Sequence, residues 1–237
     1  MALQTKMSSP RRRTQTDFLP LGEAAPANHV YELPASVTDA LHLPKGVRLA
    51  RMGVHGEGSC GYHSMCAALN VDDYVHRSTE EQKRIAYDFR CRFRDSFNRA
   101  TFEKIRGTIA TPYTKTYETV SEGLCDPRAW ADEVAIKHAA NILQANILFL
   151  DLARNRFYCN VHNDKVLRAA SKGQSETKNI PTILIHWVNH SHFEVMARIL
   201  HSGPDTTDMQ FIFRPYDRDE DAAIVDALMK TYTRECF

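Results

Sequence analysis

Helix-like and strand-like hydrophobic patterns occupy different parts of this chain, and their order constrains the fold more than any other feature. In residues 78–97, apolar side chains recur every four residues, the spacing of one buried helix face, at Ile85, Phe89, Phe93 and Phe97. Ser78, followed three residues later by Glu81, predicts a capping box at the start of this helix. The charged positions between the aromatic residues are expected to face water.

A second helix is predicted from about residue 125. Asp126 suits its N-cap, and Pro127 suits its first helical position. Its buried face is expected to contain Trp130, Val134, Ala139, Ile142 and Leu143.

Short apolar runs dominate the second half of the chain. They predict strands at 147–151, 157–162, 182–188 and 193–200, the last two joined by a turn at 189–191. Residues 47–54 are compatible with a further strand or a short helix, and residues 222–232 with a docked terminal helix. The pattern therefore predicts an α/β (α+β) fold, with a small central β-sheet flanked by helices.

Three regions are expected along the chain. Residues 1–45 contain five prolines and no hydrophobic periodicity, which predicts a disordered or flexible N-terminal tail with local order near 37–43. Residues 46–200 are expected to form the globular domain, and residues 201–237 a C-terminal extension that carries the docked helix.

Composition excludes some functional classes. The formal net charge is +1, which does not favour nucleic-acid binding, and no run of 18 apolar residues predicts a membrane span. Six cysteines in 237 residues are too sparse for a disulfide scaffold, and the first residues lack a secretory pattern. We therefore expect an intracellular protein, cytoplasmic or nuclear, with reduced thiols.

The segment "HGEGSCGYHSMCAAL" places a cysteine between a glycine-rich turn and a helical pattern. If the helix begins at Cys60, its free N–H groups and its dipole favour a thiolate and lower the thiol pKa. Gly58 and Gly61 permit a tight turn and close approach of a substrate backbone. The N–H groups of Gly58, Ser59 and Cys60 could also hold an oxyanion. Most cysteines in such a position are nevertheless small buried residues.

The segment "HWVNHSHFEV" supplies a candidate base. His192 begins a strand after a turn, so its side chain can project from the sheet end toward the start of a helix. Phe193 would point to the opposite face, and Glu194 returns to the face of His192. Glu194, or the amide of Asn189, could hold the imidazole in one tautomer.

Three segments together resemble the OTU (ovarian tumour) family of cysteine proteases. "GEGSCGYHSMCAAL" resembles the family's nucleophile motif, "WADEVAIKHAANILQANILFLD" its middle block, and "ILIHWVNHSHFEVM" its final histidine block. They occur in the family's order over about residues 47–197. The resemblance implies a papain-like OTU fold and a deubiquitinase. Such an enzyme cleaves the bond after the C-terminal glycine of ubiquitin, polyubiquitin or a ubiquitin-like modifier, without a metal or another cofactor.

The resemblance also assigns roles. Cys60 matches the nucleophile and His192 the general base. Glu57 stands where the family has aspartate, which orders the oxyanion loop or supports the triad. Glu194 stands where the family has aspartate or asparagine, which orients the histidine, and Asn189 is a second candidate for that role. Both glutamates are one methylene longer than the usual residue.

Other interpretations remain open. The chain could be a catalytically impaired OTU-like module that binds ubiquitin or another partner, or a cysteine peptidase or transferase of another papain-like family. A zinc-binding protein is a further alternative, with ligands drawn from Cys60, His63, His186 and His190. Trp187 and Phe193 could line a substrate channel but are expected to lie in the core.

Overall fold

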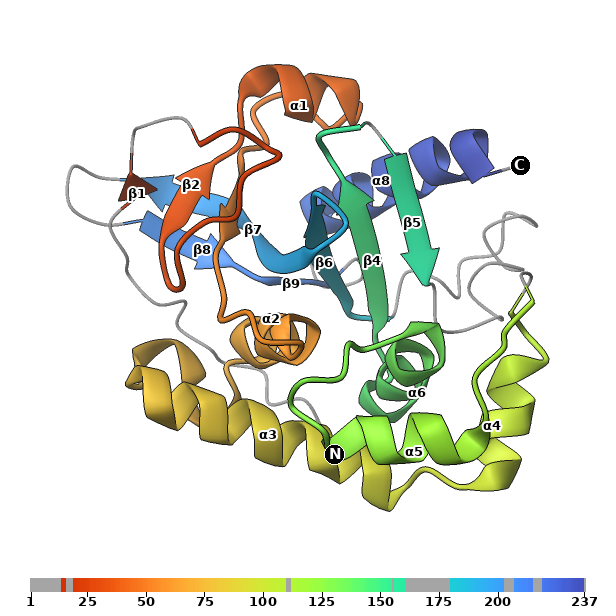
Figure 1. Cartoon of the computed structure of the whole chain (residues 1–237). Coiled ribbons are helices and arrows are strands. Elements are labelled where there is room, and N and C mark those ends of the chain that lie inside the picture. Colours follow the sequence, from red (N-terminus) through yellow and green to blue (C-terminus); the bar gives the residue numbers. More distant parts are fainter. Residues whose placement is uncertain are drawn as a thin grey trace.

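The computed structural model places helices on both faces of one mixed β-sheet (Figure 1). This arrangement confirms the predicted α/β class with a central sheet. The structure describes residues 14–15, 19–109, 112–154, 156–160, 180–202, 207–214 and 219–236.

The sheet joins strands from distant parts of the chain. Its order is β1 (Thr14–Gln15), β2 (Val30–Glu32), β3 (Leu49–Met52), β7 (His192–Ser202), β6 (Thr182–Val188), β4 (Asn146–Asp151) and β5 (Arg156–Asn160). β8 (Thr207–Gln210) pairs with β7, and β9 (Ile212–Phe213) pairs with β6. The pairs β1–β2 and β4–β6 are parallel, and the other pairs are antiparallel. The strands predicted at 147–151, 182–188 and 193–200 and the β6–β7 turn are therefore confirmed. The strand predicted at 157–162 is found as far as residue 160, and residues 161 and 162 lie outside the described part.

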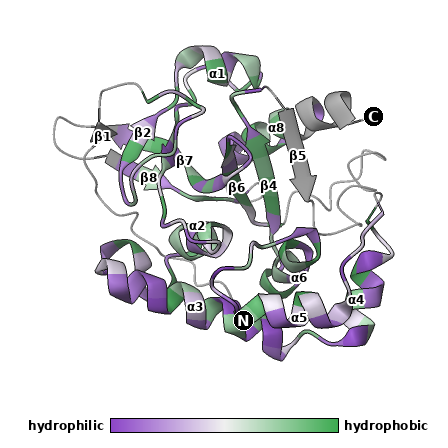
Figure 2. Ribbon diagram, viewed as in Figure 1, coloured by the Kyte–Doolittle hydropathy of each residue, from purple (hydrophilic) through white to green (hydrophobic). Residues whose placement is uncertain are grey.

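Alternation along the strands divides the core into two layers. Phe193 and Val195 face the larger layer, which packs against α2 (Cys60–Leu69), α3 (Thr79–Asp95), α4 (Arg99–Arg106), α5 (Tyr117–Cys125) and α6 (Glu133–Leu143). Met196 and Leu184 face the smaller layer, which is covered by α1 (Ala35–Ala40) and α8 (Asp219–Cys236). A 3₁₀ segment, Val71–His76, follows α2. Figure 2 shows the apolar strands β4 and β6 inside and polar residues along the outer sides of α3 and α5.

Helix α3 forms as its sequence predicts. The side chains of Ser78 and Glu81 complete the capping box, and the aromatic stripe is buried at Phe89, Phe93 and Phe97. The expectation that every charged position in this helix faces water is wrong, because Arg90 is only 1% exposed.

The second predicted helix begins later than expected: residues 126–132 form a loop between α5 and α6, and the helix itself is α6. Asp126 is the C-cap of α5, and Asp132 is the N-cap of α6, where its side chain accepts a hydrogen bond from the N–H of Ala135. The loop between them leaves Trp130 47% exposed, and Ile142 at the end of α6 is 48% exposed. Both were expected in the core. Val134 and Ala139 are fully buried, as predicted.

The domain boundaries in the structure differ from those expected. Residues 19–45 belong to the folded unit, since β2 pairs with β3 and Val30, Leu33 and Leu41 are buried. Prolines divide this region into pieces too short to show periodicity. Residues 1–13 and 16–18 lie outside the described part. Strands β8 and β9 extend the same sheet beyond residue 200, and α8 docks through Ile224, Val225 and Leu228, as predicted.

In the described part of the chain, no helix is long and apolar enough to cross a membrane.

Candidate active site

Cys60 is the first residue of α2 and lies against the start of β7. Its side chain is buried at 3% exposure, and its thiol accepts hydrogen bonds from the main-chain N–H groups of Phe193 and Gly61. The Phe193 contact places the sulfur beside the peptide that follows His192. The two segments proposed to share a proton are therefore neighbours.

The pKa of the Cys60 thiol lies above its ordinary value, which is opposite to the expectation from a helix N-terminus. Burial is the largest effect and raises the pKa, because it penalises the thiolate. The hydrogen bonds from Phe193 and Gly61 lower it, but by less. The resting sulfur is thus a protonated thiol at neutral pH.

His192 begins β7 after a turn in which Asn189 and His190 both have left-handed φ angles, of 45° and 57°. Burial lowers the pKa of its imidazole, whereas the charge of Glu194 and a ring hydrogen bond to the main-chain carbonyl of Val54 raise it. The net direction is downward, so the resting imidazole is neutral and able to accept a proton. The structure gives no hydrogen bond between this ring and the Cys60 thiol among the described residues; such contacts commonly tighten only when substrate binds.

The loop before Cys60 adopts a conformation that requires glycine. Gly58 has a φ of 82°, and a Cβ there would lie 2.4 Å from the carbonyl oxygen of Arg128. Ser59 does not cap α2 with its side chain; its hydroxyl instead donates to the carbonyl of Pro127 over 2.9 Å. Glu57 also has a positive φ, of 65°, and its 74% exposed side chain pairs with Lys83 of α3 over 3.6 Å. Glu57 thus links this loop to α3 rather than to His192.

Glu194 shares a sheet face with His192 and is completely buried. Its carboxylate forms an ion pair with Arg51 over 3.1 Å and accepts the N–H of Ala25 over 2.5 Å. Its effect on His192 is electrostatic, with no hydrogen bond between the two side chains among the described residues. The side chain of Asn189 is exposed in the turn and likewise makes no described hydrogen bond to His192.

Arg90 is a residue that sequence reasoning missed. Its guanidinium donates to the hydroxyl of Ser59 over 2.9 Å and lies 4.7 Å from the ring centre of Tyr62. It also donates to three carbonyls, those of Leu124 at 2.7 Å, Ala129 at 2.6 Å and Gly123. This one side chain therefore ties the residue before Cys60 to the end of α5 and to the loop that follows. The helical phase could have revealed it, because Arg90 lies four residues after buried Ala86.

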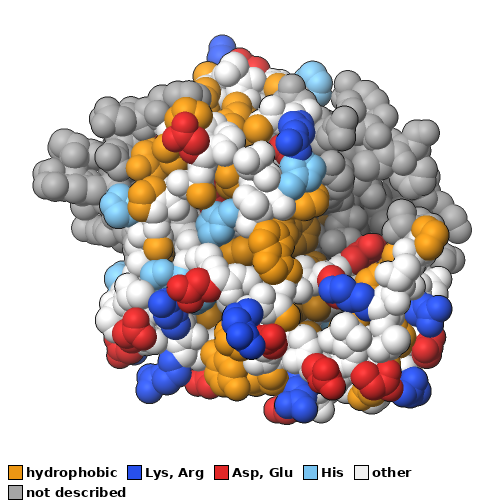
Figure 3. All heavy atoms as spheres, viewed as in Figure 1, with side chains coloured by type: hydrophobic (Ala, Val, Ile, Leu, Met, Phe, Trp, Pro, Cys, Tyr) orange, Lys and Arg blue, Asp and Glu red, His pale blue; other side chains and the backbone are white. Residues whose placement is uncertain are grey.

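Trp130 lies on the α5–α6 loop and contacts Phe193, whose N–H faces the Cys60 thiol. Its ring centre lies 6.4 Å from that of Phe193, and a Cβ on Gly61 would lie 3.6 Å from the side chain of Ala131. Figure 3 shows apolar side chains gathered near the middle of the visible face, with histidine side chains next to them. Phe193 is buried and Trp187 packs against the core, as predicted.

The four residues of the zinc alternative have other partners. His63 Nδ1 lies 2.6 Å from the hydroxyl of Tyr74, and His186 lies between two main-chain carbonyls. His190 pairs with Asp151 over 3.2 Å. Within the described ranges, no three His, Cys, Asp or Glu side chains are arranged to hold a metal ion.

Comparisons with known proteins give structural similarity without a match in sequence. No protein-family model matches the chain, and neither does any curated protein. Among solved structures, the chain is similar to an ovarian tumor (OTU) domain in complex with ubiquitin, at 15% identity and a TM-score of 0.41, over 81% of this chain and 92% of that one. A likeness of this degree leaves the function to be inferred from the site itself.

Proposed function

We propose that this protein is a cysteine-dependent deubiquitinase, which hydrolyses the bond after the C-terminal glycine of ubiquitin or a ubiquitin-like modifier. The observation that carries the proposal is the contact between the Cys60 thiol and the N–H of Phe193, which brings a buried cysteine at a helix start beside His192. The choice of substrate rests on the resemblance of the three sequence segments to the OTU family.

The proposed reaction begins from a neutral pair. His192 takes the thiol proton as the Cys60 sulfur attacks the glycine carbonyl carbon, so that a carbon–sulfur bond forms and the carbonyl oxygen becomes negative. The N–H groups of Gly58, Ser59 and Cys60 are assigned to hold this oxyanion. The imidazolium then protonates the leaving amine as the carbon–nitrogen bond breaks.

Hydrolysis of the thioester completes the cycle. His192 removes a proton from water, which attacks the acyl carbon, and the imidazolium returns that proton to the sulfur as the carbon–sulfur bond breaks; the new carboxylic acid loses its remaining proton to solvent, and ubiquitin departs with a free carboxylate. Trp130 is proposed to line one side of the substrate channel that leads to Cys60. Its ring is half-exposed, and it lies on the α5–α6 loop, which contacts Gly58. A flat ring on the loop that contacts Gly58 and Gly61 suits a thin diglycine tail.

Comparison of two cysteine variants tests the proposal. The wild type is expected to cleave di-ubiquitin and to be labelled by ubiquitin that carries a C-terminal electrophile, whereas Cys60→Ala should do neither. Cys66→Ala, the same substitution at a buried thiol of the same helix, serves as the matched control and should behave as the wild type. Equal cleavage by Cys60→Ala and the wild type would remove Cys60 from the reaction.

A catalytically impaired ubiquitin-binding module is the second candidate. The observations that favour it are the raised pKa of the Cys60 thiol and the engagement of Glu194 by Arg51. Binding of ubiquitin without labelling of Cys60 by the electrophile would select this candidate.

A further inference from the structure

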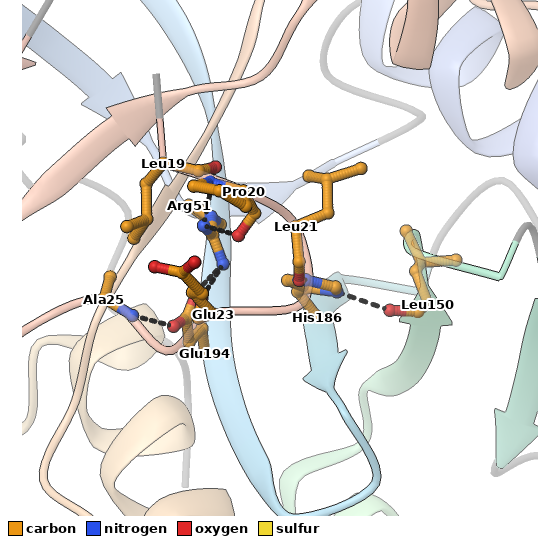
Figure 4. Close-up of polar contacts among 9 residues, drawn as sticks. All are labelled: Leu19, Pro20, Leu21, Glu23, Ala25, Arg51, Leu150, His186 and Glu194. Carbon is orange, nitrogen blue, oxygen red and sulfur yellow. Dashed lines mark hydrogen bonds and ion pairs between the residues drawn. The ribbon is translucent and has the colours of Figure 1, made fainter. Parts of the chain in front are cut away.

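Residues 19–29 form an ordered segment, here called the strap, on the sheet face that carries the side chain of Glu194. Figure 4 shows strap residues around Arg51 and Glu194, with Leu21 beside His186. The sequence analysis places this segment in a flexible tail, yet it is tied to the sheet at several polar points.

The first attachment is a buried ion pair. Arg51 and Glu194 are 1% and 0% exposed and lie 3.1 Å apart. The Arg51 guanidinium also donates to three strap carbonyls, those of Glu23 at 2.8 Å, Leu19 at 3.0 Å and Pro20 at 3.0 Å. The N–H of Ala25 donates to the other oxygen of Glu194. Because a buried carboxylate is costly unless its oxygens are satisfied, the strap fixes where this charge lies.

His186 provides the second attachment. It lies opposite Glu194 in the β6–β7 pair, and its ring nitrogens are 3.0 Å from the carbonyl oxygen of Leu21 and 2.8 Å from that of Leu150. The imidazole therefore lies between the strap and β4.

The third attachment lies beside the hydrogen-bond partner of His192. The N–H of Asn28 donates to the carbonyl of Gly53 over 2.8 Å, and the N–H of Gly53 donates to the carbonyl of His29 over 3.0 Å. A Cβ at Gly53 would lie 2.3 Å from the carbonyl oxygens of Ala25 and Pro26, so only glycine allows the strap to seat here. The next residue, Val54, provides the carbonyl that accepts a hydrogen bond from the His192 ring.

A further link joins the strap to the loop that leads to Cys60. Asn28 and Gln82 exchange two amide hydrogen bonds, at 3.0 and 3.1 Å. Gln82 Oε1 also lies 2.7 Å from His55 Nε2. The strap is thus connected both to the Gly53–Val54 segment, which contacts His192, and to the loop that leads to Cys60.

We propose that the strap positions His192 for catalysis, by fixing the Glu194 carboxylate through Ala25 and the Val54 carbonyl through its pairing with Gly53. The strap is then a positioning element of the active site and not part of a flexible tail. This inference rests on the proposed function for its effect on rate, but its effect on the His192 ring can be measured without any substrate.

The groups that face His192 set the expected direction of its titration. Glu194 on β7 and the Val54 carbonyl raise its pKa, while His186 on β6 lowers it, and His63 on α2 is also coupled to it. With the ring still buried, a displaced strap weakens the two effects that raise this pKa. The pKa of His192 should therefore fall further when the strap is unseated.

The test compares two Gly→Ala variants of the full-length chain. Gly53→Ala should unseat the strap, lower kcat on a fluorogenic ubiquitin substrate by about 10- to 100-fold with KM nearly unchanged, and move the acid limb of the pH profile to lower pH. Gly107→Ala is the matched control, because a Cβ at this end of α4 meets only ordinary contacts, the nearest at 3.4 Å. It should leave kcat and the profile unchanged.

Titration of His192 by NMR separates this inference from the proposed function. A lower His192 pKa in Gly53→Ala than in the wild type supports the strap even if no ubiquitin substrate is cleaved. A lower melting temperature with the same kcat and the same His192 pKa would make the strap merely structural and overturn the inference. If Gly53→Ala does not fold, Glu194→Gln replaces it: this variant can keep the Ala25 hydrogen bond but loses the charge, and an unchanged His192 pKa would again overturn the inference.

Discussion

At Cys60, two opposing effects act on one thiol. The helix N-terminus and the N–H groups around the sulfur stabilise the thiolate, while burial at 3% exposure destabilises it more. At His192 burial also has the largest effect and lowers the imidazole pKa. Both shifts disfavour a thiolate–imidazolium pair, so Cys60 rests as a neutral thiol and His192 as a neutral imidazole.

The rate at which iodoacetamide alkylates Cys60 should reflect the raised pKa of its thiol. Because the thiol pKa is raised above its ordinary value of 9.0, we expect the rate to climb with pH beyond 9.0, with no plateau near neutrality. Mass spectrometry of the Cys60 peptide follows the rate, and Cys91, whose pKa is raised to about 11 chiefly by burial, serves as an internal reference in the same sample. A plateau at neutral pH would show a preformed ion pair and contradict this mechanism.

At the scale of the element, α3 both packs against the core and holds the loop before Cys60 in place. Its aromatic stripe packs inward through Phe89 and Phe93, and on the same side Arg90 reaches the carbonyl ends of α5 and the hydroxyl of Ser59. The guanidinium has no described carboxylate partner; carbonyl oxygens and the face of Tyr62 stabilise its charge instead. A planar group with five donors suits this set of acceptors.

Replacement of Arg90 by lysine should therefore be costly although the charge is kept. A single ammonium nitrogen cannot reach Ser59, the end of α5 and Ala129 together, and we expect the free energy of unfolding to fall by about 2 to 4 kcal/mol. Urea denaturation measures this change. Arg84→Lys, on the exposed side of the same helix, is the control and should change it by less than about 0.5 kcal/mol. An equally small effect at Arg90 would show that the loop is held by other contacts.

At the scale of the whole molecule, several histidines are folded in their neutral form. Burial lowers the pKa of His63 to about 3, and it also lowers the pKa values of His138 and His192. When the pH lies between the folded-state and unfolded-state pKa values of these histidines, the unfolded chain binds more protons than the folded chain. Stability is therefore complete above the unfolded pKa and declines as the pH falls toward the folded one.

The pH dependence of stability tests whether the folded chain holds His63 in its neutral form. Between about pH 7 and about pH 5, the shift from 6.5 to about 3 corresponds to a loss of about 2 kcal/mol in the free energy of unfolding. His63→Gln should remove that part of the loss, whereas His201→Gln, at an exposed position, should not. Urea unfolding at both pH values measures the difference. The same decline in His63→Gln and the wild type would mean that His63 does not titrate in this way.

Local patterns in the chain predicted its regular elements well. The capping box at Ser78, the aromatic stripe of α3 and the β6–β7 hairpin depend on neighbours within a few residues, and each is found as predicted. The loop at residues 126–132 and the exposure of Trp130 were missed, because residues of this loop are placed by contacts with Gly58 and Phe193. The order of residues 19–45 was missed for the same reason.

Sequence alone therefore determined which residues could do the chemistry: a cysteine placed to start a helix and a histidine placed to start a strand. Only the tertiary structure decided that the Cys60 thiol lies against the peptide between His192 and Phe193, that burial reverses the expected thiol pKa shift, and that Glu194 is held by Arg51 and the strap. The reason is physical. Helix and strand periodicity arise from neighbouring residues, whereas desolvation and charge pairing depend on segments that meet only when the chain is folded.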